Sequence, residues 1–187
     1  MPNAYYDVMT ETFLCLYPHV FEPSKFEGEE GEGDYSLVMV FDNAEQIKTL
    51  KEAARKALAD KWPKGAPQGL RSPFRDGSEK AADWGDFMQG KIFVRAKTRR
   101  QPVVMDRSTR NLADKNAIYS GCYCKASVCP FVYDKAGNRG IGFRLNGVQL
   151  VRDGEAIGGQ SAEAIRSQFK PVEDEALAFD PAGLDEI

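Results

Sequence analysis

The feature that most constrains the fold is a strict alternation of residue types over residues 90–100, which read GKIFVRAKTRR. Ile92, Val94 and Ala96 share one parity and are apolar, a pattern typical of a β-strand with one buried face. The opposite parity is cationic, contains one aromatic ring and has no carboxylate. Its members are Lys91, Phe93, Arg95, Lys97 and Arg99, and Arg100 follows directly. Such a face suits a phosphate backbone with Phe93 stacked on a base. It equally suits a polar sheet face with Phe93 packed against a neighbour, so other features must decide.

Charge is distributed unevenly along the chain. The net charge is −7 over residues 1–34, +10 over residues 35–170 and −6 over residues 171–187. A cationic body between anionic ends indicates a polyanionic ligand and a tail that competes for the same surface.

The length of 187 residues gives room for one domain with a sizeable core. No apolar run approaches the roughly 20 residues of a membrane-spanning helix. The first residues lack the basic and then apolar pattern of a signal peptide. We therefore expect a cytoplasmic protein without a membrane partner, whose four cysteines are reduced.

The hydrophobic pattern predicts a mainly β protein with one or two helices. Strands are expected at residues 12–17, 35–41, 90–100, 119–133 and 140–152, with a hairpin turn between the last two. Pro18 and Pro23 should interrupt regular structure after the first strand. A helix is expected to begin after the N-cap Asn43, with Gln46 at the capping-box position, and to end at Pro63. Residues 64–89 form a long connection that is either functional or partly disordered.

This arrangement favours an OB-fold-like antiparallel barrel with long loops. We expect the barrel domain to cover residues 1–170, with a short helix at 161–169. Residues 171–187 are expected to form a disordered acidic tail.

Aromatic and basic residues also share one parity on the later strands. Tyr119, Tyr123 and Lys125 lie opposite an apolar face, and Arg144 belongs to the last strand. Placed beside the basic strand, these side chains predict a groove with rings under bases and cations beside phosphates. The full set of predicted DNA-binding residues is Lys91, Phe93, Arg95, Lys97, Arg99, Arg100, Tyr119, Tyr123, Lys125 and Arg144.

Metal and catalytic sites are the competing interpretations of other residues. Cys122, Cys124 and Cys129, with Cys15 or His19, could hold zinc, but their spacing differs from that of structural zinc sites and buried cysteines are commonly packing residues. Another set of side chains could hold Mg²⁺ for a nuclease, namely Asp76, Glu79, Asp83 and Asp86. We predict no metal, no cofactor and no catalytic residue.

Four stretches in order along the chain resemble a known family. They are YPHVFEP at 17–23, FRDG at 74–77, YSGCY at 119–123 and LNGVQLVRDG at 145–154. The chain resembles the single-stranded DNA-binding proteins of tailed bacteriophages, long described as a family of unknown function. The resemblance implies an OB-fold that binds single-stranded DNA during phage replication or recombination, with an acidic C-terminal tail.

The function predicted from these features is sequence-independent coating of single-stranded DNA, without enzymatic activity, in the cytoplasm of a bacterial host. The tail would tune access to DNA or dock a replication or recombination protein, and oligomerisation is left open. The alternatives are a metal-dependent nuclease that uses the acids of residues 76–86, and a basic module that binds an acidic protein.

Overall fold

The computed structural model describes residues 6–25, 28, 30–158 and 166–171. The chain divides into a first compact unit, Met1–Ile157, and a second unit, Gly158–Ile187. Most of the second unit lies outside the described residues. The expected tail at 171–187 and most of the expected helix at 161–169 lie there too, so these features and the domain boundary at 170 stay predictions.

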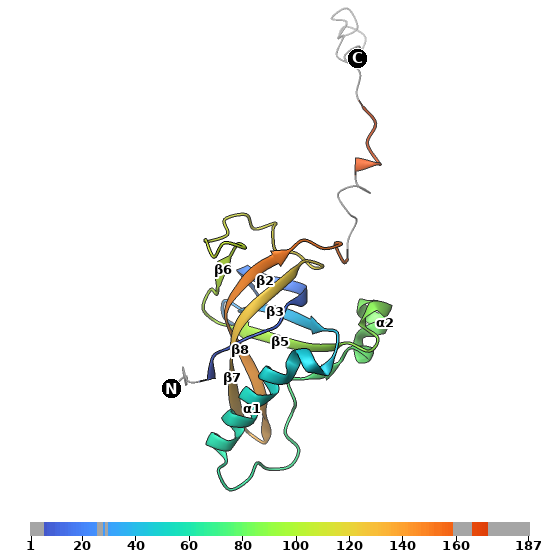
Figure 1. Cartoon of the computed structure of the whole chain (residues 1–187). Coiled ribbons are helices and arrows are strands. Elements are labelled where there is room, and N and C mark those ends of the chain that lie inside the picture. Colours follow the sequence, from blue (N-terminus) through green and yellow to red (C-terminus); the bar gives the residue numbers. More distant parts are fainter. Residues whose placement is uncertain (1–5, 26–27, 29, 159–165, 172–187) are drawn as a thin grey trace, which may run out of the picture. The chain divides into compact units, whose positions relative to one another are not determined.

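Five strands of the sheet close into a barrel (Figure 1). Around it they follow the order β2 (Phe13–Ser24), β3 (Asp34–Phe41), β5 (Ile92–Thr98), β8 (Asn138–Arg152) and β7 (Tyr123–Lys135), which pairs back onto β2. All neighbours are antiparallel except β5 and β8. The predicted OB-fold-like barrel is therefore confirmed.

Three short strands extend this barrel. β1 (Val8–Met9) pairs with β7, and β4 (Arg75–Asp76) pairs with β5. β6 (Val103–Met105) runs parallel to β8.

The first barrel strand is longer than the sequence predicted. β2 continues through Pro18 and Pro23 to Ser24, whereas we expected it to end at Tyr17. Its pairing with β3 shifts register between Leu16 and His19 and again before Ser24. Prolines fit at such irregular places because no ladder hydrogen bond is required of their nitrogen.

The predicted helix is confirmed as a short 3-10 turn, η2 (Ala44–Ile47), followed by α1 (Lys48–Lys61). The Asn43 side chain accepts a hydrogen bond from the Gln46 N–H at 3.3 Å. The Gln46 side chain in turn accepts one from the Asp42 N–H at 2.7 Å. These bonds satisfy N–H groups that a helix start leaves without a partner.

The connection between α1 and β5 contains regular structure that the sequence did not reveal. It holds the helices η3 (Gly77–Lys80), α2 (Ala81–Trp84) and η4 (Asp86–Met88). A Cβ at Gly77 would lie 2.3 Å from the Met88 carbonyl oxygen, so only glycine allows this tight fold. We call residues 77–88 the helical cover, because they pack on the outer face of the barrel.

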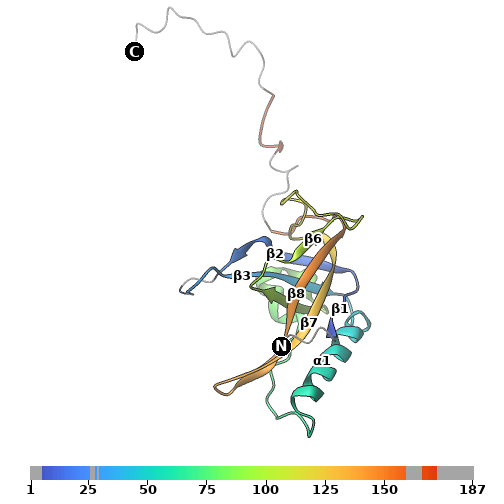
Figure 2. The same ribbon diagram turned by 90° about the vertical axis from the view of Figure 1, so that its left-hand side faces the viewer.

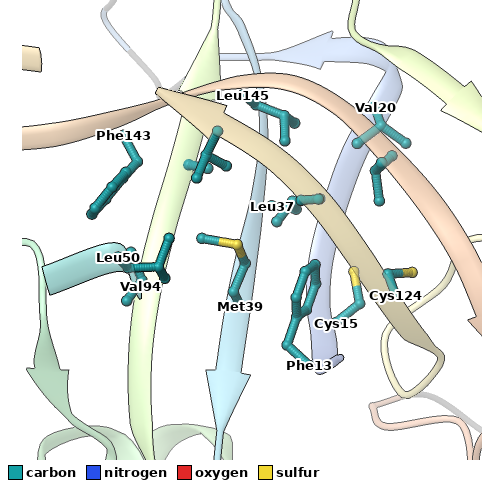
Figure 3. Close-up of a cluster of buried hydrophobic side chains, with 14 of the residues drawn as sticks. Phe13, Cys15, Val20, Leu37, Met39, Leu50, Val94, Cys124, Phe143 and Leu145 are labelled. Atoms are coloured by element: carbon teal, nitrogen blue, oxygen red, sulfur yellow. The ribbon is translucent and has the colours of Figure 1, made fainter. Parts of the chain in front are cut away.

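Apolar side chains fill the barrel and form a second layer outside it. The interior is packed with residues such as Phe13, Leu37, Met39 and Phe143 (Figure 3). The outer layer joins Leu16, Val38, Val40 and Phe93 to Ala81 and Met88 of the helical cover. The sheet is thus buried on both faces where the cover lies.

β7 and β8 continue beyond the barrel as a long hairpin (Figure 2). Its turn lies at Ala136 and Gly137, with φ angles of +51° and +82°, as a tight two-residue hairpin turn requires. Arg71 from the preceding connection bridges to Gly140 of the hairpin. The predicted turn at residues 134–138 is confirmed.

Candidate nucleic-acid interface

A basic groove lies on the outer face of the barrel, where β5 ends beside the β7–β8 hairpin. Its volume is about 880 Å³. The lining residues are Asp34, Lys97, Thr98, Arg99, Arg100, Gln101, Pro102, Phe131, Lys135, Arg144, Leu145 and Asn146. Five of them are cations and one is an acid. We call this surface the basic groove.

The cations of the basic groove come from the alternation that the sequence displays. Val94 and Ala96 of β5 are fully buried in the barrel, so Lys97 of the same strand points outward, and the exposed Arg99 follows directly after the strand. Lys97 pairs in register with Arg144 of β8, which places two cations side by side across the parallel pair. The Arg99 side chain is 94% exposed and the Lys97 side chain 57% exposed. Both side chains are therefore accessible from solvent.

Two aromatic rings of the hairpin approach glycines of the opposite strand with their tips. Phe131 is paired with Gly142, and Tyr133 with Gly140. A Cβ at Gly142 would lie 2.5 Å from the Phe131 ring, and one at Gly140 would lie 2.5 Å from the Tyr133 hydroxyl oxygen. The ring centroids of Phe131 and Tyr133 are 6.3 Å apart. The absence of a side chain at Gly142 therefore leaves space for the Phe131 ring, which is part of the lining of the basic groove.

One acidic residue already contacts the groove cations. The Asp34 carboxylate lies 3.8 Å from the Lys97 ammonium and 4.0 Å from the Arg99 guanidinium. Glu30 and Glu32 line a neighbouring cavity together with Arg99. Exposed ion pairs of this kind are worth about 0–1 kcal/mol, so a phosphate can replace the carboxylate.

A family model described as "Enterobacter phage Enc34, ssDNA-binding protein" matches residues 6–177. The chain belongs to this family. A protein named p50 from the Acyrthosiphon pisum secondary endosymbiont phage 1 is 29% identical over 177 residues, which cover 87% of this chain and 94% of p50.

Two solved structures share the fold. The single-stranded DNA-binding protein from bacteriophage Enc34, in complex with single-stranded DNA, has a TM-score of 0.69 and 20% identity, covering 83% of this chain and 91% of that one. Gp2.5, a single-stranded DNA-binding protein encoded by bacteriophage T7, has a TM-score of 0.57 and 16% identity, covering 87% and 97%. The Enc34 family thus has the barrel predicted from sequence.

In this member of the Enc34 family, Phe93 is buried and the prediction that its ring is exposed is wrong. Its side chain is 5% exposed. The Trp84 ring lies edge-on at 5.2 Å, and the Arg75 guanidinium covers it at 5.4 Å. Phe93 is buried because the helical cover, which was predicted only as a long connection, packs on this face of β5.

Three predicted residues in or just before β7, namely Tyr119, Tyr123 and Lys125, are not part of the groove lining. Tyr119 precedes the strand, and its hydroxyl accepts from the Gly154 N–H at 3.0 Å and donates to the Gly154 carbonyl at 2.8 Å. The Arg152 guanidinium lies 3.7 Å from the centre of the Tyr123 ring. Lys125 is paired with Gln149 of β8. The geometry supports a packing role for Tyr119 and brings none of these residues to the groove.

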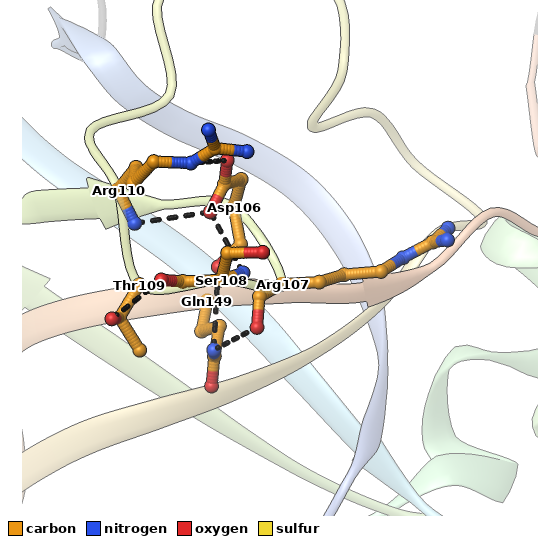
Figure 4. Close-up of polar contacts among 6 residues, drawn as sticks. All are labelled: Asp106, Arg107, Ser108, Thr109, Arg110 and Gln149. Carbon is orange, nitrogen blue, oxygen red and sulfur yellow. Dashed lines mark hydrogen bonds and ion pairs between the residues drawn. The ribbon is translucent and has the colours of Figure 1, made fainter.

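Gln149 in turn fixes a loop beside β6. Its side-chain amide donates to the carbonyl oxygens of Asp106 and Arg107 (Figure 4). The Asp106 carboxylate accepts from the N–H groups of Arg110 and Ser108, at 3.0 and 2.8 Å, and the bond from Arg110 is the main reason why its pKa is lowered. These bonds hold the loop at one end of the barrel.

The two remaining predicted cations of residues 90–100, Lys91 and Arg95, lie outside the groove lining. Lys91 pairs with Asp42 at 2.5 Å and contributes to a separate cavity with Phe74 and Arg75. Arg95 is exposed on the same strand face as Lys97. Of the ten predicted residues, the groove brings together Lys97, Arg99, Arg100 and Arg144.

Sequence reasoning missed Phe131, Lys135 and Asn146 as groove residues. Asn146 donates through its side-chain nitrogen to Asp7 and Ser127, at 3.1 and 3.3 Å. The signal was the pair of glycines at 140 and 142, which alternate with the apolar residues Ile141 and Phe143. Glycines on one face of a strand mark a site where another group approaches closely.

The cysteines that come together are not the set predicted as zinc ligands. Cys15, Cys122 and Cys124 are fully buried with their sulfurs within 4.8 Å of one another, whereas Cys129 is not part of this group. Within the described ranges no fourth histidine, cysteine or carboxylate joins them. Hydrogen bonding to its cysteine neighbours and burial raise the pKa of Cys15, which keeps that thiol protonated at neutral pH. Three sulfurs can share a soft metal ion, and the surrounding hydrocarbon suits neutral thiols equally.

The four acids of the nuclease interpretation are spread over β4, which holds Asp76, and the helical cover, which holds the other three. Asp76 accepts from the Ser78 N–H at 2.8 Å, which lowers its pKa. Glu79 pairs with Arg75, and Asp83 lies 3.9 Å from Lys80. Among the residues that the structure describes, no three acids come close enough to form a metal site.

One finding concerns membranes. Over the described part of the chain, no helix is both long and apolar enough to cross a bilayer.

Proposed function

We propose that this protein binds single-stranded DNA without regard to sequence and coats it during phage DNA replication or recombination, in the cytoplasm of the host cell. The observation that carries the proposal is the basic groove, which combines five cations with the Phe131 ring on the outer face of an OB-type barrel. Membership in the Enc34 family supports the same ligand. Coating of single-stranded DNA by this protein requires no catalytic step.

The chemistry of the groove explains tolerance of sequence. Lysine and arginine side chains contact phosphates, which are the same in every nucleotide. An aromatic ring stacks on any base, at about 1–3 kcal/mol per base. Such a groove distinguishes single from double strands, because only an unpaired strand can turn its bases onto the ring.

The first experiment measures the salt dependence of binding. A labelled oligothymidylate is titrated with the protein, followed by fluorescence anisotropy, at several salt concentrations. For single strands log K falls with log salt at about −0.7 per neutralised phosphate. We expect the double variant Lys97→Ala, Arg144→Ala to bind more weakly and with a smaller slope.

Lys56→Ala is the matched control, because Lys56 pairs with Glu52 on α1, away from the groove. It should leave both affinity and slope unchanged. An unchanged affinity and slope in the folded double variant would show that the basic groove is not the DNA site. A parallel titration with Mg²⁺ tests the nuclease alternative, which predicts cleavage of the oligonucleotide.

A further inference from the structure

A second aromatic surface lies on the same side of the barrel as the outer face of β5. Tyr17 is one of the exposed large hydrophobic residues, at 46%. Its ring is 5.3 Å from that of Trp84, which is half-buried on the helical cover. Phe93 lies beneath Trp84 and supports it. We call Tyr17 and Trp84 the outer platform.

The backbone at Tyr17 holds the ring in an unusual position. Its φ angle is +48°, in the left-handed region that residues other than glycine seldom adopt. The Tyr17 N–H donates to the Ser120 side chain at 2.9 Å, which fixes the strained conformation. Residues held in this way cluster at ligand clamps and binding sites. A ring that only packed the cover onto the sheet would not need to stay half exposed.

Cations flank the outer platform. The Lys80 ammonium lies 5.7 Å from the centre of the Trp84 ring, and the Arg75 guanidinium 5.4 Å from that of Phe93. Their carboxylate neighbours are Asp83, 3.9 Å from Lys80, and Glu79, which pairs with Arg75. All four side chains are at least one third exposed, so these ion pairs are open to exchange with phosphate.

Arg95 connects the outer platform to the basic groove. It lies on the outer face of β5 midway between Lys97 of the groove and Phe93 under the platform. Successive residues on one face of a strand are about 7 Å apart, so cations follow β5 without a break between the two surfaces.

We propose that the outer platform is a second stacking site for single-stranded DNA, so that the bound strand runs from the basic groove along β5 to Tyr17 and Trp84. This inference rests on the proposed function and extends it by defining the length and path of the footprint. A strand of intermediate length fills the groove alone, and a longer one also covers the platform.

The test uses the fluorescence of Trp84. Trp62 and Trp84 are the two tryptophans of the chain, so Trp62→Phe leaves Trp84 as a single reporter. Oligothymidylates of increasing length, from about 4 to 16 nucleotides, span the site sizes of OB-folds. We expect the longer ones to quench Trp84 emission at saturation, because a base stacks on the indole.

Two substitutions at Tyr17 separate the ring from the backbone. Tyr17→Asn removes the ring, and asparagine tolerates the left-handed conformation. It should weaken the binding of long oligonucleotides about fivefold or more, with little effect on the shortest ones. Tyr17→Phe keeps the ring and should bind like the unaltered protein.

The outcomes distinguish this inference from the proposed function. Tight binding without any change in Trp84 emission would contradict the role of the outer platform as a stacking site. It would leave the proposed DNA binding at the basic groove unaffected. Absence of binding to any single strand would overturn both. Crosslinking of the unaltered chain to an oligonucleotide that carries 5-iodouracil gives an independent readout. Attachment to the peptides with Tyr17 or Trp84 supports the platform, and attachment confined to hairpin peptides contradicts it.

Discussion

Phe93 illustrates how one side chain can belong to a basic strand and still serve the core. Lys91 just before β5 and Arg95 on β5 are both more exposed than Phe93, which is 5% exposed beneath the helical cover. Trp84 packs against the ring at 5.2 Å and the Arg75 guanidinium lies over it at 5.4 Å, so the ring is covered where a base would have to stack. At this position the ring holds the cover onto the barrel.

Phe93→Ala should therefore lower the free energy of unfolding by about 3–5 kcal/mol, the usual cost of removing a buried Phe ring. Thermal or urea unfolding, followed by circular dichroism, measures the effect. Arg95→Ala is the control for stability. Because Arg95 is exposed on the same strand, its replacement should change the free energy of unfolding little. If the Phe93→Ala protein kept its stability and lost DNA binding, Phe93 would be a DNA-contacting residue and not a core residue.

The sequence could predict which β5 residues face outward, because alternation follows from strand geometry. It placed Lys97 and Arg99 on the outward side, and both are exposed. The DNA-binding role given to them and to Arg100 and Arg144 stays a prediction. It could not predict which exterior residues become covered, since that depends on residues 77–88 folding back from a distant part of the chain. The close approach of Gly77 to Met88, and the packing of Met88 on the outer face of the barrel, are tertiary contacts that the local sequence pattern does not indicate.

At the scale of the elements, the β7–β8 hairpin is the part that completes the site. The barrel strands supply cations, and the hairpin adds Phe131 and Lys135 beyond the barrel edge. The strands and the turn of this hairpin were predictable from periodicity and from the DKAGN turn at 134–138. The position of Phe131 over Gly142 depends on the pairing register, which is altered by a bulge between Ser127 and Val128 and so cannot be read from either strand alone.

Gly142→Ala should displace the Phe131 ring and weaken binding of single strands by about 1 kcal/mol, the lower end of the stacking range. The added Cβ would lie 2.5 Å from the tip of that ring, which can rotate away with little loss of stability. The measurement is a double-mutant cycle of oligonucleotide affinity. Once Phe131→Ala has removed the ring, Gly142→Ala should have no further effect. Equal effects in both backgrounds would show that Phe131 does not stack on bases.

At the scale of the whole molecule, charge separates a basic body from two acidic regions. Within the body, the basic groove already contains Asp34 from the first of these regions. The second region, residues 171–187, carries −6, and all of it after residue 171 lies outside the described residues. The composition gives the charge of this region, but it does not indicate which surface of the protein the region contacts.

Deletion of residues 171–187 should raise the affinity for single-stranded and double-stranded DNA and narrow the preference for single strands. A tethered tail reaches roughly millimolar effective concentration, and it competes best with duplex DNA, which gains no stacking. Paired salt titrations of the full-length and truncated proteins measure this, and the difference should be largest at low salt. Identical curves would assign the tail to solubility or to a protein partner.

The location of the basic groove also decides how a strand can reach it. The barrel interior is filled by residues such as Leu37, Met39 and Phe143, so nothing is threaded through the protein. The groove is instead a surface on the outside. A nucleic acid can be laid onto it sideways at any internal position, without a free 5′ or 3′ terminus. Circular single strands and short gaps inside a duplex are therefore as accessible to this protein as linear molecules with open ends.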